Sequence, residues 1–267
     1  MSYVHGYTDR ETRRLQEQSL ILEELLHGGT FYEPGSRVLE VGCGVGAQTL
    51  ILLRRNPGIQ LTAADISEES VRQARTNVET SGYKNVSFRH ENIMENDMEP
   101  GFFDHVFVCF VLEHMDDPVL ALRKMGSLIR EGGTITVIEG DHGSGCWTPE
   151  TAASRAAWEG LVNSQRQLGH DPDIGRRLYP LLKDAGYRVE YVEPRPIYAD
   201  RSDPDLLHGV VNQIITPMVH SAERYVLEQR LVEQAAWKQG LKDLSSISSR
   251  EEGTFFYSWF KGQATRC

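Results

Sequence analysis

The segment VLEVGCGVGAQT, residues 38–49, links a strand-like apolar run to a helical run through three glycines. Gly42, Gly44 and Gly46 let the backbone turn tightly there and bring its amides close to a ligand. The next strand-like run, IQLTAAD, ends in Asp65, about where an acceptor for ribose hydroxyls belongs. A glycine loop between a strand and a helix, followed by such an acid, predicts a site for a nucleoside-containing cofactor.

The runs on both sides of this loop alternate between strand-like and helical patterns. RVLEV, IQLTAAD, VSFRH, HVFVCFV and TITVIE have the apolar and β-branched composition of buried strands. Ser67 and the pair Asp117–Pro118 are residue types that begin helices, and Gly82 is one that ends them. Five repeats of this kind predict an α/β fold with a doubly wound parallel sheet.

The regular alternation of strand-like and helical runs stops after Trp147. Pro149–Leu168 reads as a helix without a strand directly behind it, and Pro204–Leu244 is mostly helical. A helix around Ile174–Ala185 and the strand-like YRVEYVEPRPIY restore the sheet pattern, and the aromatic GTFFYSWFKG closes the chain. No repeat, low-complexity tract or linker divides the sequence, so we expect one domain with helical additions over one edge of the sheet.

Composition restricts the partners. The 267 residues are 40% hydrophobic and carry a formal charge of −10. A broad phosphate-binding surface usually needs clustered lysine and arginine, so nucleic acid is not an expected partner. The polar first residues and the short longest apolar run, VFVCFVL, predict neither an export signal nor a membrane span, and we expect a cytoplasmic protein. The four scattered cysteines have no CxxC pair or ligand-like histidine spacing, so we expect reduced thiols and no metal site.

The spacing of the glycines indicates which class of nucleoside-containing cofactor is expected. It is G-x-G-x-G rather than the G-x-G-x-x-G of dinucleotide sites, which disfavours a dehydrogenase, and a carboxylate, Glu40, stands two positions before the first glycine. LEVGCGVGAQT, together with AADIS, ENIM and FVLEHMDDP, resembles the class I S-adenosylmethionine-dependent methyltransferases of the small-molecule type, close to the quinone-biosynthesis and natural-product branches. The resemblance covers residues 32–140. It implies S-adenosyl-L-methionine as the cofactor and S-adenosyl-L-homocysteine as the product.

The resemblance also assigns roles to single residues. Glu40 and the glycine loop would hold the methionine end of the cofactor, with loop amides facing its carboxylate, while Asp65 would accept the ribose hydroxyls and Ile66 would pack on the adenine. The implied cofactor-binding residues are Tyr7, Glu40, Gly42, Cys43, Gly44, Gly46, Asp65, Ile66, Asn92, Ile93, Phe110 and Val111.

Four of these residues form two pairs, each of which directly follows a predicted strand. Asn92 and Ile93 follow the third strand, where the family often has an aspartate for the adenine amino group, and Asn92 can offer its side-chain carbonyl instead. Phe110 and Val111 follow the fourth strand, where the family lines the sulfonium, although such residues are also common in plain core.

Three histidines are candidates for a general base. Ligands of open α/β sheets bind beyond the carboxyl ends of the strands, and Asp141 and His142, in ITVIEGDHGSG, follow the fifth strand-like run. His142 could deprotonate the methyl acceptor while Asp141 orients it. His114, next to Glu113, ranks second, and His5 is the third candidate. The Asp–His pair could instead hold the acceptor or form a polar turn, because methyl transfer sometimes needs only positioning.

The N-terminal residues are expected to form a lid. The sequence TDRE, residues 8–11, has the spacing of a capping box and predicts a helix that ends at Gly28–Gly29. By the family resemblance, residues 1–30 would form a helical lid in which Tyr3 and Tyr7 fold over the cofactor mouth, although a frayed terminus is the alternative.

The whole chain, residues 1–267, is therefore expected to be a single methyltransferase domain. Its Rossmann-like sheet would have about seven strands, mostly parallel with a C-terminal antiparallel strand. Residues 31–146 would form the cofactor-binding core, and helical additions at 147–170 and 203–246 would roof the acceptor pocket or form the interface of a homo-oligomer.

The predicted activity is methyl transfer to a small molecule by in-line attack on the sulfonium methyl. The first alternative is a regulatory protein that binds S-adenosylmethionine without turnover. A nucleic-acid methyltransferase is disfavoured by the charge and by the absence of an Asn/Asp-Pro-Pro-aromatic or Pro-Cys motif.

Overall fold

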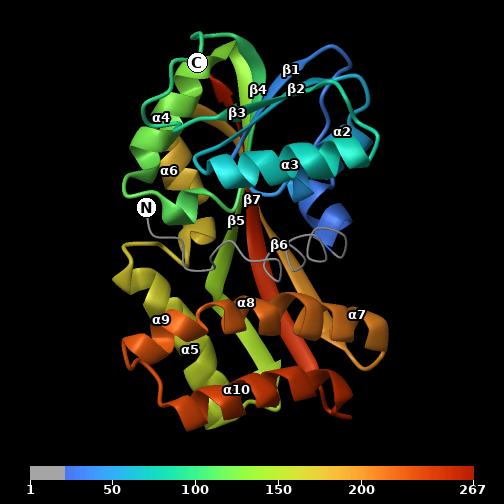
Figure 1. Ribbon diagram of the computed structural model, residues 1–267, viewed down its shortest axis with the longest axis vertical. Helices are drawn as coiled ribbons and strands as arrows, with labels where there is room; N and C mark the ends of the chain where they lie inside the picture. The colour runs from blue at the N-terminus through green and yellow to red at the C-terminus, as the bar shows by residue number, and fades with distance from the viewer. Residues whose placement is uncertain (1–21) are drawn as a thin grey trace. The chain divides into compact units, whose positions relative to one another are not determined.

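The computed structural model describes residues 22–267, and these divide into two compact units (Figure 1). The larger unit comprises Glu23–Gly140, Ile174–Arg195 and Trp259–Cys267. The smaller unit comprises Asp141–Asp173 and Pro196–Ser258, together with Leu22. Both predicted helical additions, at 147–170 and 203–246, fall within the smaller unit, whereas the predicted cofactor-binding core falls almost wholly within the larger one.

The larger unit is an alternating α/β structure. Residues 22–27 are helical and end in a turn at Gly28–Gly29, as predicted. The labelled elements are β1 (Arg37–Val41), α2 (Ala47–Arg55), β2 (Gln60–Asp65), α3 (Glu68–Thr80), β3 (Val86–His90), β4 (Phe103–Cys109), the 3₁₀ turn η1 (Leu112–His114), α4 (Pro118–Leu128), the 3₁₀ turn η2 (Ile174–Arg177) and α6 (Leu178–Asp184), with β5 (Ile129–Thr148), β6 (Tyr187–Asp200) and β7 (Thr254–Arg266) shared between the units.

The seven strands form one sheet in the order β3-β2-β1-β4-β5-β7-β6. The β1–β2, β1–β4, β2–β3 and β4–β5 pairs are parallel, and β7 runs antiparallel near the C-terminus. Val41 of β1 lies beside Ala64 of β2 and Val108 of β4, and Cys109 of β4 lies beside Ile138 of β5. The sheet confirms the predicted Rossmann-like fold, and this register brings the carboxyl ends of β1, β2, β4 and the first half of β5 to one edge.

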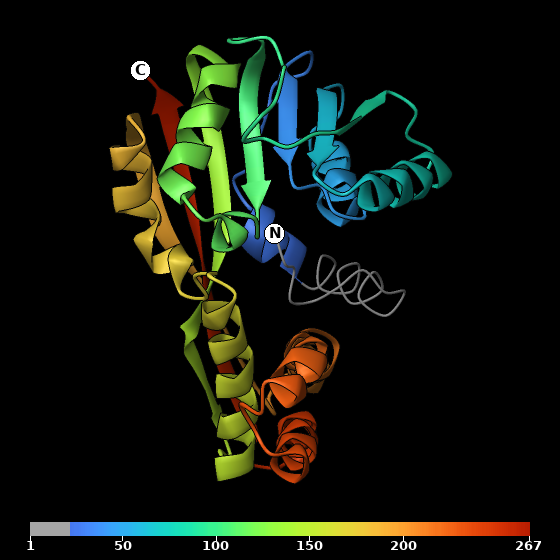
Figure 2. The same ribbon diagram turned by 60° about the vertical axis from the view of Figure 1, so that its left-hand side comes forward.

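Helices cover both faces of this sheet. Figure 2 shows α4 and α6 on one side of the first five strands and α2 and α3 on the other. The predicted helix starts are confirmed, since the Ser67 hydroxyl accepts from Ser70 N and the Asp117 carboxylate accepts from Leu120 N. The caps and the apolar faces together fix where each helix begins and which side it buries.

The fifth strand differs from the prediction. TITVIE was expected to end before Asp141 and His142, but β5 continues to Thr148 and contains both residues. A side chain at Gly145 would place its Cβ 2.5 Å from the Trp158 ring, so this glycine gives an aromatic side chain room to pack and does not mark a turn. The prediction that the Asp–His pair follows the strand end was therefore wrong.

The smaller unit is mainly helical and contains the C-terminal parts of β5 and β6 and the N-terminal part of β7. An aromatic cluster forms part of its core, in which Trp147 and Phe255 stack and Trp158 meets Tyr257 edge to face. Its helices are α5 (Ala152–Gln167), α7 (Pro204–His208), the π-helix η3 (Gly209–Ile215), α8 (Thr216–Ser221), α9 (Glu223–Glu228), α10 (Gln234–Ser246) and the 3₁₀ turn η4 (Ile247–Ser249).

The four cysteines are free thiols, with Cys43 and Cys109 buried and Cys146 and Cys267 exposed. Over residues 22–267, no helix combines the length and the apolar character that crossing a bilayer requires.

Candidate active site

The glycine loop is fastened to the end of β2. The N–H groups of Gly42 and Cys43 both donate to the carbonyl oxygen of Ala64, at 2.8 and 3.0 Å, and Gly44 N donates to Asp65 Oδ2 at 2.8 Å. These three amides are thus engaged within the protein. The donor that the loop offers to an anion is the positive N-terminal end of α2, the nine-residue helix that begins at Ala47.

The three loop glycines are needed for different reasons. All three have positive φ angles, but a Cβ on Gly42 would lie 2.3 Å from Val111 Cγ2, and one on Gly46 would lie 3.1 Å from Ala74 Cα. Within residues 22–267, no atom lies within 4 Å of a Cβ placed on Gly44, whose φ is 51°. Gly44 is therefore the loop glycine over which a ligand could approach the backbone.

Asp65 combines a binding and an anchoring position. Its Oδ2 accepts from Gly44 N and its Oδ1 accepts from Ser67 N at 2.9 Å, which leaves each oxygen a further lone pair. Burial raises the pKa of Asp65 although both N–H donors oppose this. The next residue, Ile66, is 48% exposed. A partly buried acceptor beside an exposed apolar side chain could hold the ribose and the base of a nucleoside.

Glu40 is a buried carboxyl group next to the loop. Its Oε2 accepts from the Thr49 hydroxyl at 2.6 Å, and its Oε1 makes no hydrogen bond within residues 22–267. Burial raises the pKa of Glu40 to about 8, and the nearby Asp65 charge adds to the shift. An unpaired buried carboxyl oxygen fits a cationic group such as the ammonium of the cofactor's methionine end.

Glu40→Gln is expected to stabilise the unliganded protein more as the pH rises. The unfolded Glu40 loses its proton near 4.5 and the folded one near 8, so the free energy of unfolding falls with rising pH between these values. The variant lacks this loss, and its advantage should grow by up to roughly 1.4 kcal/mol per pH unit across that window. Urea unfolding at pH 5, 7 and 9 measures the difference, with the exposed Glu33→Gln as control. Equal pH profiles for both variants would refute the burial of Glu40.

The turn after β4 is the third part of this edge. Phe110 has a φ of 60°, and its N–H donates to Ile138 O at 2.9 Å. The next two amides, of Val111 and Leu112, donate to Glu139 Oε1 at 3.0 and 2.7 Å. Sequence reasoning missed Glu139, although a glutamate inside a strand-like apolar run was a visible signal.

The residues after β3 lie at the same edge of the sheet. Asn92 Oδ1 accepts from Met94 N at 3.1 Å and Asn92 O accepts from Glu95 N, so the side chain supports a local turn. One lone pair of the Asn92 carbonyl remains for the predicted adenine contact. Ile93 is buried in the core with Val41 and Ala64.

The predicted bases separate between the two units. His114 lies in η1 of the larger unit, with its Nε2 3.4 Å from Glu113 Oε1. His142, like Asp141, belongs to the smaller unit, where its Nδ1 lies 2.7 Å from the Tyr257 hydroxyl. Gly42, Asp65, Asn92 and Phe110 belong to the larger unit, as does His114. The predicted contribution of Asp141 and His142 to the same crevice stays a prediction. Tyr7, Tyr3, His5 and the capping box of the lid lie outside the described residues.

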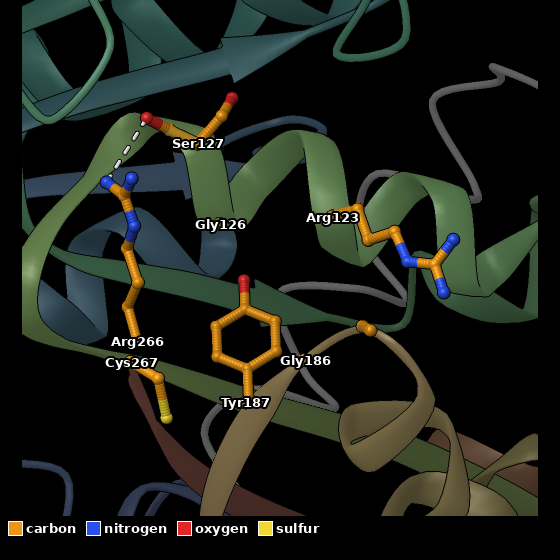
Figure 3. A pocket seen from close by; sticks show the side chains of 8 residues that line it. Arg123, Gly126, Ser127, Gly186, Tyr187, Arg266 and Cys267 are labelled. Atoms are coloured by element: carbon orange, nitrogen blue, oxygen red, sulfur yellow. Dashed lines mark hydrogen bonds between the residues drawn. The ribbon is translucent and has the colours of Figure 1, made fainter.

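A pocket in the larger unit contains none of the predicted site residues (Figure 3). Its arginines bind main-chain carbonyls at helix ends. Arg266 donates to Ser127 O in the last turn of α4 and to Ile129 O just after it, and Arg123 donates to the carbonyl oxygen of Asp184, the last residue of α6, at 2.6 Å. These bonds complete the helix C-termini. The pocket is lined by Arg123, Gly126, Ser127, Ala185, Gly186, Tyr187, Arg266 and Cys267.

Comparison with known proteins identifies the family. The profile of a family described as a methyltransferase domain matches residues 32–186, which include the glycine loop, Asp65 and Glu139. The chain belongs to this methyltransferase family. The match confirms the resemblance drawn from the glycine loop, and it extends beyond the segment from which that resemblance was inferred.

Two curated relatives of this methyltransferase are named for particular reactions. It is 39% identical over 103 residues to the ubiquinone biosynthesis O-methyltransferase of Xanthomonas campestris pv. campestris, across 38% of this chain and 42% of that protein. It is 29% identical over 134 residues to the 27-O-demethylrifamycin SV methyltransferase of Amycolatopsis mediterranei, across 50% of this chain and 49% of that protein. The matched segments span about half or less of these relatives.

Solved structures share the fold of this methyltransferase. Phosphoethanolamine N-methyltransferase 2 of Haemonchus contortus, solved with phosphomonomethylethanolamine and S-adenosylhomocysteine, aligns with a TM-score of 0.61 at 16% identity, over 100% of this chain and 60% of that one. A 4+2-cyclase aligns with a TM-score of 0.57 at 19% identity, over 99% of this chain and 85% of that one. At these identities the likeness concerns the fold alone.

Proposed function

We propose that this protein transfers a methyl group from S-adenosylmethionine to a small-molecule acceptor. The proposal is supported chiefly by the backbone of Gly44, which is uncovered in the described part of the chain and bonded to Asp65, in a chain of the methyltransferase family. Beside it lies the Glu40 oxygen that has no hydrogen-bond partner within residues 22–267. One edge of the sheet thereby offers a carboxyl group for an ammonium, an acceptor for hydroxyls and an apolar surface for a base.

Each of the site residues contacts a different part of the cofactor. Glu40 Oε1 receives the ammonium of the methionine end, Asp65 accepts the ribose hydroxyls and Ile66 covers one face of the adenine. Phe110 and Val111 border the sulfonium. When bound, the cofactor supplies a methyl group already activated by the sulfonium charge, so the protein's task is to align the acceptor and exclude water.

The acceptor is a small molecule with a hydroxyl group. Both relatives described above carry O-methylation in their names, which supports an oxygen nucleophile. The formal charge of −10 disfavours a nucleic-acid substrate. A hydroxyl must lose its proton as the new bond forms, and a histidine with a pKa near neutrality can take it.

The two histidine candidates can be separated by their pH profiles. Replacing the true base by alanine should lower kcat about 100-fold between pH 6 and 9, with S-adenosylhomocysteine affinity unchanged, because only the proton transfer is lost. His142→Ala and His114→Ala are compared with His208→Ala, a surface control. Full turnover of His142→Ala over this range would end its role as a base.

Product identification tests the proposed activity. The protein is incubated with methyl-labelled S-adenosylmethionine and a metabolite extract, and labelled small molecules are identified by mass. We expect a product heavier by one methyl group and stoichiometric formation of S-adenosylhomocysteine. Binding of the cofactor without transfer to any metabolite would favour the regulatory alternative.

A further inference from the structure

Two successive residues of β5 hold three successive amides of the turn after β4. Ile138 O accepts from Phe110 N at 2.9 Å, and Glu139 Oε1 accepts from both Val111 N and Leu112 N. Glu139 is fully buried, and its Oε2 has no partner in the part of the chain that the structure describes. The hydrogen bonds that Glu139 makes there include both bonds to the turn, and the backbone N–H of Glu113 adds to them.

The turn needs this support. Phe110 has a φ of 60°, a left-handed conformation that is strained for a residue with a Cβ. Such a conformation persists only where surrounding contacts enforce it, and it is common at binding sites. The bonds from Ile138 and Glu139 fix the backbone on both sides of Phe110.

The carboxyl group of Glu139 is itself expensive to bury. Burial, followed by the charge of Glu113, raises its pKa well above the usual range, while the backbone N–H groups of the turn oppose this shift. An apolar side chain would fill the same position in a strand at lower cost. What Glu139 adds in return is the geometry of the turn.

That turn packs directly on the glycine loop. Val111 Cγ2 occupies the space where a Cβ on Gly42 would stand, only 2.3 Å away. Gly42 in turn shares its acceptor, Ala64 O, with Cys43, and the loop continues to Gly44 and its bond with Asp65. A displacement of the turn would therefore remove the support on one side of the loop.

We propose that Glu139 is a positioning residue for cofactor binding, which holds the Phe110–Leu112 turn against the glycine loop and thereby sets the affinity of the loop for its ligand. The nature of that ligand rests on the proposed function. The positioning of the turn by Glu139 rests only on the hydrogen bonds and the Val111–Gly42 packing described above.

The test compares Glu139→Met and Glu139→Gln with Glu131→Met, an exposed control on the same strand. S-adenosylhomocysteine affinity is measured by calorimetry, and hydrogen exchange is followed in peptides covering residues 108–116. Glu139→Met should weaken binding about tenfold or more and speed exchange in those peptides, since two hydrogen bonds are lost. Glu139→Gln keeps an acceptor oxygen and should stay within about threefold of wild type. Glu131→Met should change neither quantity.

Three outcomes would overturn the proposal. These are wild-type affinity in folded Glu139→Met, a Gln variant as weak as the Met variant, and exchange that rises equally throughout the larger unit. If Glu139→Met fails to fold, Glu139→Asp, which retracts the carboxylate by one methylene, should weaken binding and speed exchange in the same peptides. A wild-type protein that binds no S-adenosylhomocysteine would refute the proposed function. The exchange measurement would still test whether Glu139 holds the Phe110–Leu112 turn in place.

Discussion

Asp65→Ala is expected to weaken S-adenosylhomocysteine binding about 100-fold, because two hydroxyls lose hydrogen bonds to a charged acceptor. The effect on folding should be smaller. Asp65 loses its bonds to Gly44 N and Ser67 N in this variant, but the protein also escapes the cost of burying the carboxylate, which is visible in its raised pKa. Calorimetry and thermal unfolding of the unliganded protein measure the two effects separately.

A ligand analogue makes this test specific to the ribose. Wild-type protein should bind the 2′,3′-dideoxy analogue of S-adenosylhomocysteine about 100-fold more weakly than the natural product, whereas Asp65→Ala should hardly distinguish them. Asp97→Ala, which removes an exposed aspartate paired with Arg89, serves as the control and should behave as wild type. If Asp65→Ala still discriminates between the two ligands as strongly as wild type does, Asp65 is not the ribose acceptor.

Gly42→Ala is expected to lower the free energy of unfolding by about 2–4 kcal/mol, from the sum of left-handed strain and overpacking. The new Cβ would stand 2.3 Å from Val111 Cγ2, and the residue keeps a φ of 75°. For a chain of this size the melting temperature should fall by roughly 4–8 °C. Differential scanning calorimetry of the unliganded protein measures it.

Gly35→Ala is the matched control for Gly42→Ala. Gly35 also has a positive φ, of 89°, but no atom of the described residues lies within 4 Å of its Cβ position, so only the backbone strain of about 1 kcal/mol remains. The double variant Gly42→Ala/Val111→Ala should recover part of the loss by removing the clashing methyl groups. Equal melting temperatures for the two single variants would mean that Val111 does not pack against Gly42.

Much of the larger unit could be predicted because its signals are local. A strand buried on both faces reads as a continuous apolar run, so RVLEV and HVFVCFV were recognisable without partners. Ser67 and Asp117 mark helix starts through bonds to amides three residues ahead, a distance the sequence displays directly. The glycine loop and Asp65 were visible because their spacing follows from one strand–loop–helix unit.

The features that escaped prediction depend on contacts between distant segments. The continuation of β5 past Asp141 and His142 goes with packing of the Trp158 ring against Gly145, a contact that the sequence does not display. Glu139 was passed over because its bonds to Val111 and Leu112 exist only once β5 lies beside β4. Patterns within one sequence do not show which distant segments will lie side by side in the fold.

Calorimetric titration of the wild-type protein with S-adenosylhomocysteine, with NAD⁺ titrated under the same conditions, tests which cofactor the glycine loop binds. We predict one site of micromolar affinity for S-adenosylhomocysteine and no measurable binding of NAD⁺, since the G-x-G-x-G loop, Asp65 and Glu40 suit a nucleoside with an ammonium rather than a dinucleotide. The absence of S-adenosylhomocysteine binding, or tighter binding of NAD⁺, would refute the assignment of S-adenosylmethionine as the cofactor.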